Sequence, residues 1–247
     1  MKILLTLLIM AGILSIPCSP AVAADKFVTD VFPTNAGELR ITFIGHGTLM
    51  LAYGGKIIHI DPWLQLSDYS TLPPADLILV THEHPDHLDA KAIALLTRPG
   101  KTILALTATC ATKVPGGIVM KNGDIKNLAG LRIEAVPAYN IVQKRPDGQP
   151  FHPPGIGNGY VLTLGDKRVY VGGDTENIPE MKSLGAIDVA FLPMNQPYTM
   201  TPEMVAAAAG SFHPRVLYPY HFGDTDTRKI VELLKDSGTE VRIRSMK

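Results

Sequence analysis

The chain has 247 residues, 46% of them hydrophobic, and it carries 23 basic and 23 acidic side chains. This length and apolar content suit one large α/β domain that buries its own core. The balanced charge gives no attraction for a polyanion, which argues against a nucleic-acid partner. We therefore expect a small-molecule substrate, and we leave the oligomeric state open.

Residues 1–24 have the features of a cleaved secretory signal peptide. A basic second residue precedes an apolar run at residues 3–14, and small residues offer cleavage after Ala23 or Ala24. The apolar run is too short to span a bilayer comfortably, and no other stretch is long enough, so we expect no transmembrane segment in the mature chain. Residues 25–247 are expected to form a single domain that is secreted or periplasmic in a bacterium.

Cys18 falls within this signal and raises the alternative of a lipid anchor, which the residues before it do not favour. Removal of the signal leaves Cys110 as the only cysteine, so the mature chain forms no internal disulfide. Cys110 follows an apolar stretch closely, and we expect it to be a buried small side chain.

Short β-type runs recur along the chain, with helical patterns between them. Strands are expected at residues 39–44, 48–52, 56–60, 77–80, 102–106, 131–136, 160–164, 168–171, 188–192 and 216–218. Helices are expected at residues 89–96, 201–210 and 227–236, with Asp89 and Thr201 as N-caps of the first two. This mixture predicts a layered α/β fold with sheets inside and helices outside.

The stretch from residue 138 to residue 159 has no periodicity and is rich in proline and glycine. Loops of this length inside a compact domain are usually functional or disordered. We interpret this one as a loop that borders the active site.

A run of residues that can ligate metals follows the apolar strand at residues 77–80. It reads Thr81-His82-Glu83-His84-Pro85-Asp86-His87 and holds three of the eight histidines in the chain. Imidazole nitrogen and carboxylate oxygen are ligands that zinc and similar divalent metals favour. His82 and His84 can face one metal, and Asp86 and His87 can face a second beside it. The run therefore predicts a metal site.

The pattern His-x-His-x-Asp-His after a strand resembles the signature of the metallo-β-lactamase superfamily. The resemblance extends to Ile-Gly-His-Gly-Thr at residues 44–48, Ile-His-Ile-Asp-Pro-Trp-Leu at 58–64, Gly-Gly-Asp-Thr at 172–175 and Tyr-Pro-Tyr-His-Phe-Gly at 218–223. The first two segments resemble a lactonase-like branch of metal-dependent hydrolases that includes ascorbate-6-phosphate lactonase. The resemblance implies a four-layer αββα sandwich of two mixed β-sheets flanked by helices, with the metals at one edge of the sheets.

The resemblance also implies roles for two later residues. Asp174 would bridge the metals, and His221 would bind the second metal. Together with the histidine run they would hold two divalent ions, expected to be zinc, with manganese or iron as alternatives.

The chain departs from the family pattern at one position. The family supplies a third histidine to the first metal in a Pro-Ala-x-His setting, whereas this chain has Asn140 there. Asn140 could bind weakly or through water, His152 in the nearby loop could replace the missing histidine, or the first site could fill only when substrate arrives. We favour His152.

Other residues near these motifs are candidates for supporting roles. His46 is expected near the metals, in contact with a ligand or the substrate, and His46 or Asp86 could protonate the leaving group. Asp61 could orient a ligand histidine. Lys144 and Arg145 could attract an anionic substrate, although loop cations are usually just solvated.

These features predict a hydrolase that activates a metal-bound water to cleave an ester, lactone, amide or phosphodiester bond. The fold alone does not select among these bonds. We rank ester or lactone hydrolysis above β-lactam hydrolysis. The alternatives are a degenerate, non-catalytic metal- or ligand-binding member of the fold and, with less support, an iron-containing redox protein.

Overall fold

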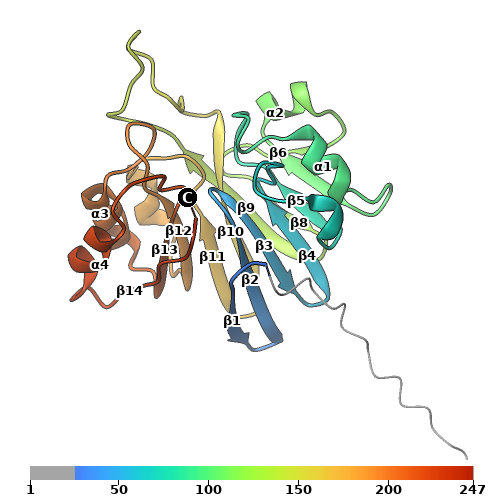
Figure 1. Ribbon diagram of the computed structural model, residues 1–247, viewed down its shortest axis with the longest axis horizontal. Helices are drawn as coiled ribbons and strands as arrows, with labels where there is room; N and C mark the ends of the chain where they lie inside the picture. Colours follow the sequence, from blue (N-terminus) through green and yellow to red (C-terminus); the bar gives the residue numbers. More distant parts are fainter. Residues whose placement is uncertain (1–25, 247) are drawn as a thin grey trace, which may run out of the picture.

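The computed structural model describes residues 26–246, in which the apolar runs form two seven-stranded β-sheets (Figure 1). The first sheet contains, in spatial order, β1 (Thr29–Thr34), β2 (Gly37–Gly45), β3 (Thr48–Tyr53), β4 (Lys56–Ile60), β5 (Leu77–Leu79), β6 (Ile103–Leu106) and β7 (Ile118–Val119). Strands β1 to β4 are antiparallel, and β4 to β7 are parallel. This sheet is therefore mixed.

The second sheet repeats this plan. It contains β8 (Ile125–Leu128), β9 (Leu131–Ala138), β10 (Gly157–Leu164), β11 (Lys167–Val171), β12 (Val189–Pro193), β13 (Val216–Tyr220) and β14 (Glu240–Val241). Strands β8 to β11 are antiparallel and β11 to β14 are parallel. Parallel strands leave their carboxyl ends at one edge of a sheet, which is where later residues such as Asp174 and His221 emerge.

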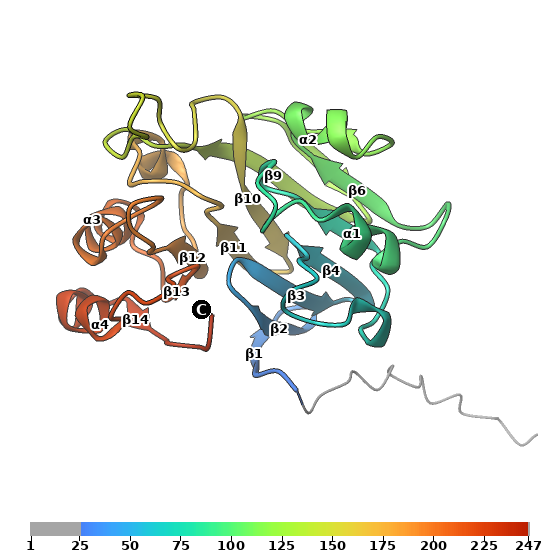
Figure 2. The same cartoon turned by 45° about the horizontal axis from the view of Figure 1, so that its top comes forward.

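Helices cover the outer faces of the two sheets, as Figures 1 and 2 show. On one side lie α1 (Ala90–Leu96) and α2 (Ala108–Lys113), and on the other α3 (Pro202–Phe212) and α4 (Arg228–Leu234). Two short 3₁₀ turns, η1 (Tyr69–Thr71) and η2 (Pro179–Ser183), complete the elements. The expected four-layer αββα sandwich is confirmed.

The expected N-caps are also present. The Asp89 carboxylate accepts hydrogen bonds from the backbone at Lys91 and Ala92, and the Thr201 hydroxyl accepts one from Met204. Such caps each stabilise a helix by about 1 kcal/mol. Helix α3 does not stop at Gly210 as expected. It continues to Phe212, which is buried, and ends where His213 adopts a left-handed conformation.

The side chains of β5 explain why this strand is apolar throughout. Leu77 and Leu79 join the core between the two sheets, whereas Ile78 and Val80 pack in a second core on the outer face of the first sheet. A strand buried on both faces reads as a continuous apolar run. Cys110 is buried in this second core, as expected.

A cluster of polar side chains joins the edges of the two sheets. Asp30 of β1 accepts hydrogen bonds from the Arg244 guanidinium, at 3.0 Å from Nε and 2.6 Å from Nη2, and from the Tyr218 hydroxyl of β13. We call this cluster the Asp30 clip.

Across residues 26–246, no helix combines the length and apolar character needed to cross a bilayer. The predicted signal peptide at residues 1–24, including Cys18, lies outside the described residues.

Candidate metal centre

Five segments meet at one edge of the sandwich and bring together the residues predicted from the sequence. They are the turn between β2 and β3, the histidine run after β5, the loop between β9 and β10, and the turns after β11 and β13. Their histidines and aspartates form two groups, in each of which the ligand atoms all lie within 4.8 Å of one another. We name these groups site A (His82, His84, His152, Asp174) and site B (His46, Asp86, His87, His221).

Site A lies between the histidine run and the long loop. Nδ1 of His84 lies 3.0 Å from Nε2 of His82 and 3.2 Å from Nε2 of His152. Nε2 of His152 is also 3.2 Å from Oδ2 of Asp174. Three imidazoles and one carboxylate therefore converge on one point.

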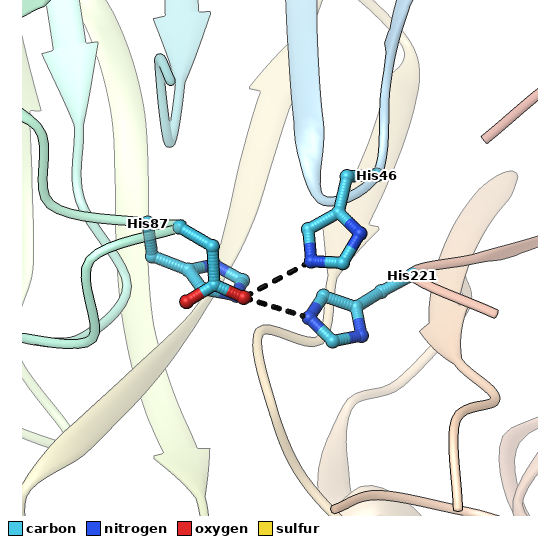
Figure 3. Close-up of side chains that lie close together, drawn as sticks. His46, His87 and His221 are labelled. Atoms are coloured by element: carbon cyan, nitrogen blue, oxygen red, sulfur yellow. Dashed lines mark hydrogen bonds and ion pairs between the residues drawn. The ribbon is translucent and has the colours of Figure 1, made fainter. Parts of the chain in front are cut away.

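Site B has the same donor set. The Nε2 atoms of His46 and His221 lie 3.0 and 3.4 Å from Oδ2 of Asp86, and Figure 3 shows both rings pointing toward that carboxylate. Nε2 of His87 is 3.7 Å from the same oxygen. The structure thus places His46 among candidate ligands, whereas we expected it to contact a ligand or the substrate.

Asp174 stands between the two sites. Its Oδ1 is 3.5 Å from Nε2 of His87, and its Oδ2 is 3.6 Å from Nε2 of His221 and 3.2 Å from Nε2 of His152. Burial would raise the pKa of this carboxyl, but its electrostatic interactions with the neighbouring His221 and His87 hold the pKa well below its usual range. An ionised carboxylate that faces both sites is suited to bridge two cations.

The charges and unpaired atoms of the centre fit a bound cation. His87 Nε2 and Asp174 Oδ1 are buried, and neither has a hydrogen-bond partner within the described chain. Burial lowers the pKa of His87, yet the carboxylates of Asp174, Asp61 and Asp86 raise it to about 10. Buried polar atoms without partners are costly. The imidazole and carboxylate donors match a zinc-type divalent metal.

Asp61 orients one of these donors from behind, as we expected. Nδ1 of His87 donates to Oδ2 of Asp61 over 2.7 Å, which turns Nε2 toward site B. The carboxylate also accepts from the backbone N–H of Thr81 at 2.8 Å and from its hydroxyl at 2.6 Å. Carboxylates that support a ligand histidine in this way strengthen metal binding.

The geometry separates the roles of Asn140 and His152. Oδ1 of Asn140 accepts from the backbone N–H of His152 at 2.8 Å and from its Nδ1 at 2.7 Å. His152 therefore presents Nε2 to site A, while Asn140 lies behind it. His152, and not Asn140, is thus the residue of this pair that lies with His82, His84 and Asp174 in one group of candidate ligands.

Glu176 was not anticipated from the sequence, although it organises this region. Its carboxylate is 1% exposed and accepts from Nδ2 of Asn140 at 3.1 Å. It also accepts from the three backbone N–H groups of residues 141–143, at 2.7 to 2.9 Å. The only signal in the sequence was its position two residues after Asp174, which does not distinguish it from a surface glutamate.

Backbone turns of unusual conformation aim several of these side chains. His46, Asp61 and His221 have φ values of 50°, 46° and 48°, in the left-handed region. Such residues each cost about 1–3 kcal/mol and cluster at functional sites. The N–H of His221 donates to the carbonyl of His46 at 2.9 Å, which ties two of the turns together.

A cavity of about 570 Å³ opens onto both sites. Six site residues line it, namely His46, His84, Asp86, His152, Asp174 and His221. The other walls include Trp63, Phe151, Tyr198 and Arg145, two of which belong to the long loop that we expected to border the site. The volume lies within the range typical of small-molecule sites.

Two mixed sheets between helical layers, with paired histidine and aspartate clusters at one sheet edge, define the metallo-β-lactamase class of folds. The family described as "Beta-lactamase superfamily domain" matches residues 40–221, and the chain belongs to this superfamily.

Similar proteins agree with this placement. A crystal structure from Parabacteroides distasonis, provisionally described as a metal-dependent hydrolase, is 50% identical with a TM-score of 0.86, and covers 90% of this chain and 100% of that one. A UPF0173 metal-dependent hydrolase of Thermus thermophilus is 33% identical over 192 residues, 74% of this chain and 84% of the relative. The metallo hydrolase Igni18 of Ignicoccus hospitalis is 27% identical with a TM-score of 0.69, over 85% and 96% of the two chains.

Proposed function

We propose that this protein is a binuclear, zinc-type metallohydrolase that cleaves an ester or lactone bond in a small molecule. The observation that carries the proposal is the pair of adjacent sites, each with three histidines and one aspartate, that open into one cavity, with Asp174 of site A also near the histidines of site B. The relatives described as metal-dependent hydrolases support it. The narrower resemblance to the ascorbate-6-phosphate lactonase group stays a prediction.

In this proposal, the three histidines of site A would hold one ion, the three histidines of site B would hold the other, and Asp174 would be a carboxylate ligand available to both sites. Imidazole and carboxylate ligands favour zinc, and manganese or iron are the alternatives. Two such ions would lower the pKa of a coordinated water and polarise the bond under attack.

The pKa values of Asp86 and His46 bear on the roles that these side chains can play beside the ions. Burial would raise the pKa of Asp86, but hydrogen bonds from His221 and His46 hold it well below its usual range. An ionised Asp86 is suited to act as a metal ligand or a proton acceptor. Burial lowers the pKa of His46, which favours the neutral imidazole that a metal ligand requires.

The alternative of a non-catalytic family member depended on Asn140 leaving site A one histidine short. His152 supplies a third imidazole beside His82 and His84. We therefore favour the hydrolase.

We further propose that residues 1–24 direct secretion or export to a bacterial periplasm, on the sequence features described above. N-terminal sequencing of protein recovered from the periplasmic fraction would test this. A mature terminus after Ala23 or Ala24 is expected, and an intact Met1 would contradict it.

The first test of function is the metal content of the protein without residues 1–24, measured by mass spectrometry beside a His152→Ala variant. About two ions per chain are expected, falling to about one in the variant. A panel of aryl esters and lactones then tests turnover, which a chelator should abolish. A metal-free protein, or turnover that survives the chelator, would refute the proposal.

A further inference from the structure

We propose that the cavity binds substrates that carry a compact anionic group, a carboxylate or a phosphate, and that Arg145 binds this group. The inference rests on the proposed hydrolase function and names the class of substrate for that site. It makes Arg145 a specificity-determining residue on the long loop between β9 and β10.

Arg145 differs from every other arginine in the described chain. The other eight, Arg40, Arg98, Arg132, Arg168, Arg215, Arg228, Arg242 and Arg244, each have an acidic oxygen within 3.7 Å. Arg145 forms no ion pair with a residue in the range 26–246, and it lines the cavity that opens onto both metal sites. An unpaired guanidinium at a substrate cavity is available to a ligand.

The guanidinium is also held in place. Its Cζ lies 5.2 Å from the centre of the Phe151 ring, and its Nη2 donates to the Phe151 carbonyl at 3.3 Å. Nε and Nη1 have no hydrogen-bond partner among the described residues. Because arginine donates through a planar fork that matches carboxylate and phosphate oxygens, a group held in this way is suited to bind either anion.

The charge of the cavity favours an anion. Apart from Asp86 and Asp174, which belong to the metal sites, no acidic residue lines it, and Arg145 is its only lysine or arginine. The two proposed divalent ions outweigh the two carboxylates. An anionic substrate would therefore be attracted both by the proposed ions and by Arg145.

The remaining walls suit a cyclic, apolar substrate body. Trp63, Phe151 and Tyr198 line the cavity together with the polar Gln65 and Asn195, and the rings of Phe151 and Tyr198 pack edge to face with centroids 5.1 Å apart. Aromatic walls typically bind the body of a ligand, while a small number of polar groups fix its orientation.

Lys144 provides a matched control. It neighbours Arg145 and is also a cation on the same loop, but it does not line the cavity. Replacing Lys144 by glutamine removes the same charge from the loop without touching the proposed contact.

The experiment compares three acetate esters on the metal-loaded protein: neutral phenyl acetate, 4-acetoxybenzoate and 4-acetoxyphenyl phosphate. Arg145→Gln should raise KM for at least one of the two anionic esters by about 10- to 100-fold and leave phenyl acetate unchanged. Lys144→Gln should behave as wild type, and Arg145→Lys should restore part of the loss. Which anionic ester is affected more distinguishes carboxylate from phosphate.

A binding measurement separates this inference from the proposed function. Calorimetry with the products 4-hydroxybenzoate and 4-hydroxyphenyl phosphate needs no turnover. If wild type hydrolyses none of the esters but its affinity for a product anion falls by about tenfold or more in Arg145→Gln, the anion site stands and the hydrolase proposal fails for esters. The role of Arg145 would be overturned if wild type bound neither product anion, or if wild type and Arg145→Gln bound them with equal affinity. It would also be overturned if Arg145→Gln raised KM for phenyl acetate as much as for the anionic esters.

Discussion

Sites A and B present the same donor set but are supported differently. Site B takes its residues from the turn between β2 and β3, the segment between β5 and α1, and the turn after β13, and one of them, His87, is fixed by the buried Asp61. Site A takes His82 and His84 from the segment between β5 and α1 and Asp174 from the turn after β11, but His152 comes from the long loop between β9 and β10. The difference indicates that a loop can contribute to a candidate metal site when a buried carboxylate, here Glu176, holds that loop.

Removing Asp174, which lies near histidines of both sites, should reduce metal content and turnover more than the other substitutions. Asp174→Ala takes away the one carboxylate that lies within 3.6 Å of histidine nitrogens in both sites. We expect the content of bound metal to fall from about two ions per chain to less than one, and turnover to disappear. Metal analysis after gel filtration checks this, and a variant that retains both ions would contradict the shared role.

A substitution at Gly47 should damage site B selectively. A Cβ at this position would lie 2.9 Å from Cε1 of the His87 ring, closer than packed atoms allow. Gly47→Ala should therefore displace His87 and cost one ion, at about 1–3 kcal/mol of stability. The control is Gly210→Ala in α3, where a Cβ meets nothing within 4 Å and both ions should remain. Metal titration that gives the same stoichiometry for Gly47→Ala and the control would count against this geometry.

Weakening the contacts of Glu176 with the loop between β9 and β10 should reduce metal binding least of the three substitutions. The loss should be confined to site A. Glu176→Gln replaces a carboxylate that accepts four hydrogen bonds, so His152 should be held less firmly. We expect the affinity of one ion to fall about 10- to 100-fold, with the other unchanged.

Competition with a chelator, followed through the visible spectrum of the cobalt-substituted protein, would measure this. The control is Glu180→Gln, which loses only an exposed contact with the Tyr139 hydroxyl. Equal weakening of both ions would mean that Glu176 acts on the fold as a whole.

Much of the centre could be predicted because its signals are local. One apolar strand is followed directly by the run that contains His82, His84, Asp86 and His87. A strand followed by a turn can be predicted from hydrophobic periodicity and residue composition. The ten expected strands all overlap observed ones. The later residues Asp174 and His221 needed the family resemblance, since each alone is an ordinary polar residue after a strand.

The parts of the site and fold that the sequence did not predict depend on contacts between residues far apart in the chain, or on elements too short to show a pattern. Glu176 accepts a hydrogen bond from Asn140, which is 36 positions away in the sequence, and no sequence pattern predicts that contact. Strands β7 and β14 have two residues each, too few to show alternation. Strand β1 contains Pro33, which argues against a central strand, and β1 is tolerated because it lies at the sheet edge.

The Asp30 clip has a consequence for the order of events in folding. The contact between Asp30 and Arg244 joins residues 214 positions apart, so a ribosome has made nearly the whole chain before the clip can close. Contacts of such long range are slow to form because closing a large loop costs entropy. The Asp30 clip is therefore expected to close late in folding, after β1 and the segment that follows β14 have both reached their places.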